Sequence, residues 1–196
     1  MYGPSGHTIL VESEFTIYIT EYPGTTGTLT YTGSQLSPVF TNYDPDQLDI
    51  SGTYTATNAG TYSAVFTPKS GYAFADGSTT KSVSWTINKA ASNPATISAT
   101  SFTLPGGSYD ENSSSATISK NGATGTVTVT KVTMTIEMYG QKFWYSISNS
   151  TSSATLTFGK SFGYAGMNNY IEYWLKIAAD TNYPEKYFTV NVSYSG

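Results

Sequence analysis

Apolar and polar residues alternate along most of this chain, so that an apolar side chain recurs at every second position. In residues 80–88 the alternation places Val83, Trp85 and Ile87 on one side of an extended backbone and hydroxylated residues on the other. A period of two is the repeat of a β-strand that buries one face. The same pattern predicts further strands over residues 14–20, 27–32, 61–67, 96–104, 116–119, 125–130, 154–158, 170–178 and 186–194.

Turn-forming residues separate the predicted strands. Gly, Pro, Asn and Asp recur between them, and Asp76–Gly77 is a strong signal for a tight turn before the strand over residues 80–88. No segment shows a convincing 3.6-residue helical repeat. Many short strands at a spacing of roughly 8–12 residues are typical of a β-sandwich. The pattern therefore predicts an all-β fold.

A long hairpin is predicted over residues 131–147. Its outgoing arm alternates over residues 131–138, and a turn is expected around residues 139–141. Trp144 in the returning arm then lies on the outer face, because neighbouring residues of a strand point to opposite sides. The residues of that arm expected to face inward are Phe143, Tyr145 and Ile147.

The length of the chain, 196 residues, allows two domains of the common size of about 100 residues. The segment over residues 89–94 follows a complete predicted strand, is small and polar, and ends in Pro94. Because proline resists both helix formation and ladder pairing, this segment is the predicted boundary. We expect a first domain over residues 13–89 and a second over residues 95–196, the latter with the hairpin as an insertion. Residues 1–12 are predicted to be a tail or an extra strand.

Charge and composition exclude several functional classes. Charged residues make up 11% of the chain, against about 25% in typical soluble domains, and the formal net charge is -4. The basic residues are scattered singly, whereas nucleic-acid binding needs several of them converging on phosphates. No apolar run reaches the length of about 20 residues that a membrane span needs, so no membrane insertion is expected. The absence of cysteine excludes disulfides and thiolate metal sites.

Candidate chemistry in the sequence is sparse. The only histidine is His7, so a nucleophilic triad lacks its usual base. Asp44, Asp46 and Asp49 suggest a calcium loop, but their surroundings lack the central glycine and the bidentate terminal glutamate of such a loop. Capping of a turn by aspartate side chains is the interpretation that we favour. We expect no enzyme activity, no cofactor and no metal site.

Residues 58–64 resemble the tyrosine corner of immunoglobulin folds, in which a tyrosine hydroxyl bonds back to the upstream backbone. Tyr62 takes the place of that tyrosine, and Ala64 stands where the core cysteine would be. The wider stretch, about residues 25–90, resembles the bacterial immunoglobulin-like repeat family. The segments that carry the resemblance are residues 29–34, 42–44, 50–53, 58–62, 67–72, 76–77 and 83–90.

From Ala95 onward the chain resembles a second, looser repeat of the same class, on residues 97–104, 122–127 and 178–183. The resemblance implies two tandem immunoglobulin-like β-sandwich domains. Similar modules occur in surface proteins of Gram-positive gut bacteria and in phage tail and capsid proteins. The resemblance therefore implies a non-catalytic adhesion or spacer module, extracellular and displayed on a bacterial cell surface or a phage virion. The fold by itself implies no substrate.

A carbohydrate-binding module is the alternative function, and the expected partner is a host or cell-surface glycan or protein. Strand parity in residues 170–178 turns Trp174 outward, with Glu172 and Lys176 beside it. Leaving a large apolar side chain exposed forgoes about 1.5–3 kcal/mol of burial free energy, so an outward tryptophan needs a reason. Two explanations stay open for Trp144 and Trp174: packing against a neighbouring element, or recognition of a sugar ring or a protein surface.

Overall fold

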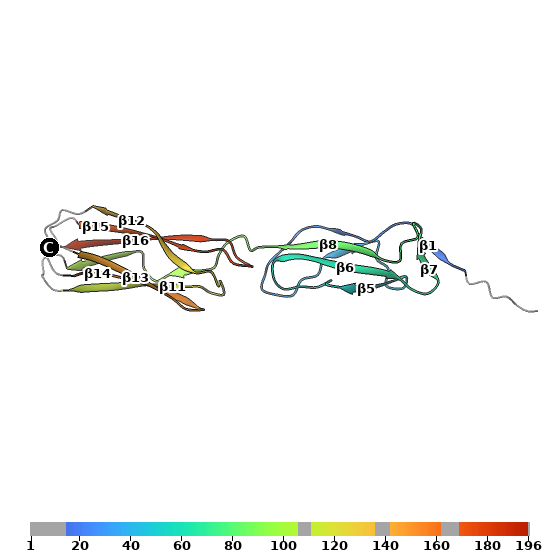
Figure 1. Cartoon of the computed structure of the whole chain (residues 1–196), viewed down its shortest axis with the longest axis horizontal. Helices are drawn as coiled ribbons and strands as arrows, with labels where there is room; N and C mark the ends of the chain where they lie inside the picture. Colours follow the sequence, from blue (N-terminus) through green and yellow to red (C-terminus); the bar gives the residue numbers. More distant parts are fainter. Residues whose placement is uncertain (1–14, 106–110, 136–141, 162–168, 196) are drawn as a thin grey trace, which may run out of the picture. The chain divides into compact units, whose positions relative to one another are not determined.

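The computed structural model describes residues 15–105, 111–135, 142–161 and 169–195. Every regular element among these residues is a β-strand, which confirms the all-β prediction (Figure 1). The described part of the chain contains no helix that is long and apolar enough to cross a membrane.

The chain divides into two compact units. The first comprises residues up to Leu29 together with Gly33–Ile87, and the second comprises Thr30–Thr32 and the residues from Asn88 on. The strands up to residue 88 form three sheets, with the strand orders β3-β8-β6-β5, β2-β4 and β1-β7. Their bounds are β1 Ile17–Ile19, β2 Gly24–Thr26, β3 Leu29–Thr30, β4 Val39–Thr41, β5 Leu48–Gly52, β6 Gly60–Pro68, β7 Tyr72–Phe74 and β8 Lys81–Asn88.

The core of the first unit gathers around Phe66 on β6. Phe66 is fully buried, and the ring centroids of Phe40 and Tyr43 lie 5.2 and 5.3 Å from its own. Ala64, the neighbour of Phe66 on the same face of β6, is also buried, as the period of two predicts. The other buried apolar residues of this core are Ile19, Leu48 and Phe74.

The corner around Tyr62 forms as the sequence predicts. The hydroxyl of Tyr62 donates a hydrogen bond of 2.6 Å to the carbonyl oxygen of Asn58. The ring of Tyr62 packs on the indole of Trp85, which is buried, with 4.9 Å between the two centroids. Trp85 in turn donates from Nε1 to the carbonyl oxygen of Thr53 at 2.7 Å. These bonds satisfy the polar end of each ring while the apolar bodies stay packed.

The second unit has a sandwich-like architecture of two four-stranded sheets (Figure 1). Their strand orders are β10-β16-β15-β12 and β13-β14-β11-β9, and β10 pairs with β16 in parallel. The bounds are β9 Thr96–Ile97, β10 Ser101–Pro105, β11 Asn112–Ser119, β12 Val127–Thr135, β13 Lys142–Asn149, β14 Ser153–Ser161, β15 Asn169–Ile177 and β16 Lys186–Ser195.

The inner faces of the two sheets share one core. Tyr173 of β15 is fully buried, and its ring stacks on Phe158 of β14 with 5.7 Å between the centroids. Because β14 and β15 belong to different sheets, this contact joins the two layers. Burial raises the pKa of the Tyr173 hydroxyl and raises that of Tyr194 to about 12. Other buried residues of this core, drawn from both sheets, are Ala116, Ile118, Leu156, Ile171, Leu175, Ile177, Val190 and Val192.

The two arms of the expected hairpin do not pair with each other. Strand β12 is hydrogen-bonded to β15 and β13 to β14, in different sheets. The expectation of a hairpin over residues 131–147 is therefore wrong for the described arms, and its turn at residues 139–141 lies outside the described residues. Each arm has an apolar face of its own, so each can pack on the core from its own sheet. Phe143 and Ile147 do so as expected, whereas Tyr145 on the edge strand β13 stays 45% exposed.

An ion pair closes the turn between β7 and β8. The Nζ of Lys81 forms a salt bridge with the carboxylate of Asp76 and lies 3.9 Å from the ring centroid of Tyr22. Ser78 donates to the same carboxylate from its backbone N–H at 3.1 Å and from its hydroxyl at 2.7 Å. The hydrogen bond from Lys81, followed by those from Ser78, lowers the pKa of Asp76 from 3.8 to about 2.

Truncation of Phe66 to Ala is expected to destabilise the first unit by about 3–5 kcal/mol, the usual cost of removing a large core aromatic ring. The measurement is chemical unfolding of the full chain in a Trp144→Phe, Trp174→Phe background, so that Trp85 fluorescence reports on the first unit. Ser63→Ala, at an exposed position of the same strand, is the control and should change the unfolding free energy by less than about 0.5 kcal/mol. Equal losses in the two variants would contradict the assignment of Phe66 to the core.

The Asp76 carboxylate is expected to make the stability of the first unit depend on pH in the acid range. Because its pKa is lower in the folded chain than in the unfolded chain, its contribution is present above a pH of about 4 and is lost as the pH falls through about 2. Asp76→Asn should therefore flatten the fall of the thermal midpoint across this range. Melting curves of the first unit over a pH series measure the effect. Parallel pH profiles for the variant and the wild type would show that this carboxylate does not contribute.

Candidate functional site

The structure places the two candidate tryptophans on different sheets. Trp144 lies on β13 and is 36% exposed, whereas Trp174 lies on β15 and is 39% exposed. Both strands contribute alternate residues to the same core, so the two indoles face outward from opposite layers of the second unit. A single flat ligand surface therefore cannot contact both of them.

Trp144 covers a glycine on the neighbouring strand. It pairs with Gly159 of β14, and a Cβ added at Gly159 would lie 2.9 Å from Cζ2 of the indole. The same Cβ would lie 2.4 Å from the carbonyl oxygen of Asn112 on β11, the other neighbour of β14. The missing side chain leaves the space that the indole occupies, and an aromatic ring across from a strand glycine shields the backbone from water. Packing thus accounts for the outward position of Trp144.

Trp174 does not cover a glycine and is held by a hydrogen bond from its indole N–H. Its Nε1 donates to Oε2 of Glu172, on the same face of β15, at 2.8 Å. The Nζ of Lys131 on β12 lies 5.6 Å from the ring centroid, within the range of a cation–π contact. A register shift between Val129 and Lys131 brings this lysine opposite Trp174. Polar neighbours therefore fix the orientation of the indole while part of its surface stays accessible.

Two tyrosines share the outer face with Trp174. Tyr170 lies on β15 at the same parity and is 38% exposed, and Tyr187 lies on β16, opposite Lys176, and is 54% exposed. We call Tyr170, Trp174 and Tyr187 the outer aromatic strip. Of these three rings, only that of Trp174 was predicted from the sequence to face outward. The outward position of Tyr170 could have been predicted from the sequence, because Tyr170 has the same strand parity as Trp174. The position of Tyr187 follows only from the register between β15 and β16.

Two carboxylates and two ammonium groups border the outer aromatic strip. Lys176 forms a salt bridge with Glu185, which also accepts a hydrogen bond of 2.9 Å from the hydroxyl of Tyr187. The hydrogen bond between the two charged groups raises the pKa of Lys176 and lowers that of Glu185. Lys131 and Glu172, both next to the indole, are the other two groups. The two positive and two negative charges sum to zero.

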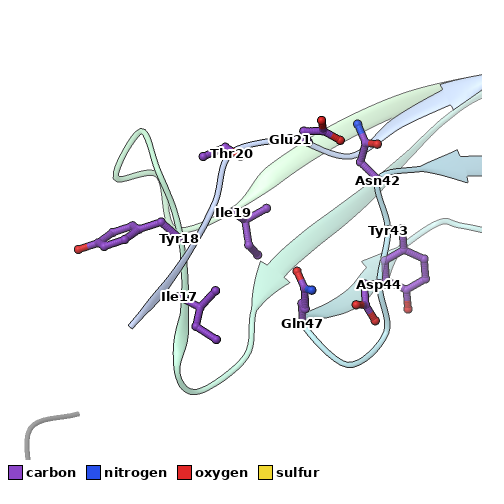
Figure 2. Close-up of a pocket in the computed structure, with 9 residues that line it drawn as sticks. All are labelled: Ile17, Tyr18, Ile19, Thr20, Glu21, Asn42, Tyr43, Asp44 and Gln47. Atoms are coloured by element: carbon purple, nitrogen blue, oxygen red, sulfur yellow. The ribbon is translucent and has the colours of Figure 1, made fainter. Parts of the chain in front are cut away.

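The first unit has a surface hollow between β1 and the loop that follows β4 (Figure 2). Its volume is about 410 Å³. Ile17 and Ile19 project from β1 toward the loop, and Tyr18 projects to the opposite side (Figure 2). The residues that line the hollow are Ile17, Tyr18, Ile19, Thr20, Glu21, Asn42, Tyr43, Asp44 and Gln47.

Oxygen-bearing side chains surround this hollow, but their carboxylates are not gathered into a metal site. Oδ1 of Asp44 accepts a hydrogen bond of 2.9 Å from the backbone N–H of Asp46, which confirms the expectation of turn capping. Asp49 instead lies 3.6 Å from the Nζ of Lys69. No group of three His, Cys, Asp or Glu side chains that could hold a metal ion occurs in the part of the chain that the structure describes. The hollow thus offers hydrogen-bond acceptors beside two isoleucines.

Comparison with known proteins does not identify a family. No protein-family model matches the sequence, and no curated protein matches it. Similar solved structures include an endo-fucoidan hydrolase from glycoside hydrolase family 107 and a variant of that enzyme, with 14% and 13% sequence identity and TM-scores of 0.27 and 0.28. The alignments cover 100% and 99% of this chain but only 30% of each hydrolase chain. At these TM-scores the likeness supports no conclusion about fold or activity.

Substitution of Gly159 by Ala is expected to destabilise the second unit by about 1–3 kcal/mol, because the added methyl group would overlap the backbone of β11 and the indole of Trp144. Chemical unfolding of the full chain in a Trp85→Phe background, followed by the fluorescence of Trp144 and Trp174, measures the loss. Thr157→Ala, two residues away on the same face of β14, is the matched control and should cost less than about 1 kcal/mol. An unchanged unfolding free energy for Gly159→Ala would mean that the indole is not seated over the glycine.

Proposed function

We propose that the chain consists of two tandem immunoglobulin-like β-sandwich modules, over residues 13–89 and 95–196, which act without catalysis as spacer and adhesion modules of a surface-displayed protein. The observation that carries this proposal is the direction of the chain through each unit. In both units the chain enters at one end and leaves at the other. Modules of this kind can be joined in series without the chain having to double back.

In the second unit the entry point lies beside the start of the last strand. The side-chain amide of Asn93 donates to the carbonyl oxygen of Pro184 at 2.9 Å, and the Nζ of Lys186 donates to that of Ala95 at 2.6 Å. From there the ten residues of β16 run about 33 Å at the usual rise of a strand. Entry and exit of this unit are therefore separated by the length of the sheet.

The first unit has the same arrangement. Its first described strand, β1, pairs in parallel with β7. Because β7 follows β6 and precedes β8 in the chain, the entry end is the end where β6 finishes and β8 begins. Strand β8 is antiparallel to β6, so β8 ends beside the first residue of β6, where Ile87 pairs with Gly60. The eight residues of β8 carry the chain about 26 Å from the entry end.

The composition supports a role outside the cell. Serine and threonine solvate much of the surface in place of charged groups, and the nine basic residues form no cluster in the sequence. A bacterial cell surface and a phage virion are both suitable settings for such a module. Carbohydrate binding is the second candidate function, and the outer aromatic strip of the second unit favours it.

The spacer proposal predicts that the second unit resists force applied along the chain. Force at the entry first acts on β9, which pairs with β11 over only two residues. Once that short pairing opens, the force acts on β10 and β16, which are parallel and paired over the five residues of β10, so their hydrogen bonds must break together in shear. Pulling the two strands apart from the same end would break the bonds one after another at lower force. Single-molecule force spectroscopy can compare the two directions.

Because the chain has no cysteine, introduced cysteines serve as unique attachment points for this measurement. Ala91→Cys with an added C-terminal cysteine applies force along the strands, whereas Pro105→Cys with the same C-terminal cysteine peels β10 from β16. We expect a markedly higher unfolding force in the first geometry. An equal or lower force along the chain would argue against a spacer that carries mechanical load.

A further inference from the structure

We propose that the outer aromatic strip binds an uncharged oligosaccharide that lies along β15. The proposal deepens the adhesive half of the proposed function and rests on it, whereas the force measurement tests the spacer half without any ligand. Four features carry it: the spacing of the rings, the hydrogen bonds that fix them, the polar groups between them and the balance of charge on this face.

The three rings follow the direction of the strands. Tyr170 and Trp174 are four residues apart on β15, which corresponds to about 13 Å. Tyr187 lies on the adjacent strand opposite Lys176, two residues beyond the tryptophan. The outer aromatic strip is therefore about 20 Å long and one to two strands wide. An elongated row of rings fits an extended chain of sugar units better than it fits a single compact ligand.

Each ring is fixed before a ligand arrives. The hydroxyl of Tyr170 bonds to Oδ1 of Asn191, and the hydroxyl of Tyr187 bonds to Glu185. The indole N–H of Trp174 bonds to Glu172 in the same way. With their polar ends engaged, the rings lose little conformational entropy when a ligand stacks on their exposed surface. The apolar face of a sugar ring is a suitable partner for such a surface.

Hydrogen-bonding groups alternate with the rings. Glu172 lies between Tyr170 and Trp174 on the outer face of β15 and pairs with Asn191 of β16, while Thr189 pairs with Trp174. Carboxylate, amide and hydroxyl groups together accept and donate hydrogen bonds, as the hydroxyl groups of a sugar require. The face thus offers rings for stacking and polar groups for hydrogen bonding, the two kinds of contact that a sugar can make.

The balance of charge selects against ionic ligands. Lys176 is paired with Glu185, and Lys131 lies over the indole that Glu172 binds. A nucleic acid or a sulfated or uronic-acid glycan needs an excess of positive charge on the surface that binds it. Because the described residues of this face carry no excess of either sign, its charge complements a neutral ligand.

Titration of the full chain with neutral oligosaccharides tests the proposal. The probes are soluble hexasaccharides of glucose, xylose, mannose, galactose and N-acetylglucosamine, with oligogalacturonate and heparin hexasaccharides as anionic counterparts. In ¹⁵N-labelled protein the indole signals of Trp85, Trp144 and Trp174 can be followed separately. We expect at least one neutral probe to shift the Trp174 signal and to leave the other two in place.

Two alanine variants and a matched control locate the site. Trp174→Ala and Tyr187→Ala should each weaken binding of the active probe by about tenfold or more, as loss of a central aromatic contact does. Trp144→Ala removes an indole of similar exposure from the opposite sheet and should leave the affinity unchanged. Tyr187→Ala keeps the test valid if the tryptophan variant does not fold, because Tyr187 is the more exposed of the two.

Three results would overturn the proposal. The first is that no neutral probe binds, and the second is that an anionic probe binds more tightly than every neutral one. The third is that Trp144→Ala weakens binding as much as Trp174→Ala does. A chain that passes the force test and fails this one would be a spacer whose adhesive surface lies elsewhere.

Discussion

One-sided burial of the long strands is the constraint on which the rest of the structure depends. A strand has two faces, so burying Tyr173 and Leu175 of β15 in the core necessarily turns Trp174 toward solvent. A shift of one residue would bury Glu172 and Lys176 in their place, at a cost of several kcal/mol for each ion. The packed core of the second unit and its outer aromatic strip are therefore two consequences of one register.

One-sided burial also shapes the first unit, where hydrogen bonds to backbone carbonyl oxygens hold the packed aromatic side chains. Burial of Trp85 leaves its indole N–H paired, because the carbonyl oxygen of Thr53 accepts it, and the hydroxyl of Tyr62, which packs on Trp85, donates to the carbonyl oxygen of Asn58. A buried ring without such an acceptor would lose a hydrogen bond that water otherwise provides. The corner thus supports the core in a chain that has no cysteine and therefore no disulfide.

The two proposed roles, connection and recognition, draw on different parts of the second unit. The ends of its sheets receive and release the chain, so they are suited to transmit load between modules. The outer faces of the sheets take no part in that connection. One of them carries an aromatic residue seated on Gly159, and the other carries three rings held by hydrogen bonds. A single sandwich can therefore be both a link and a contact surface.

The sequence by itself determined the features that depend on residues close together in the chain. Alternation predicted that Trp85 lies on the apolar face of its strand and that Trp174 faces outward, and the resemblance of residues 58–64 to a tyrosine corner predicted the bond made by Tyr62. Each of these follows from the geometry of one strand or one turn.

Only the tertiary structure decided which strands became partners. The local pattern of β12 and β13 is equally compatible with one hairpin and with two sheets, because both arrangements bury one face of each strand. The register between distant strands then seated Trp144 on Gly159 and brought Tyr187 to the face of Trp174. Such contacts exist only after the sheets have packed, so no local pattern could distinguish the indole that covers a glycine from the one held by Glu172 and Lys131.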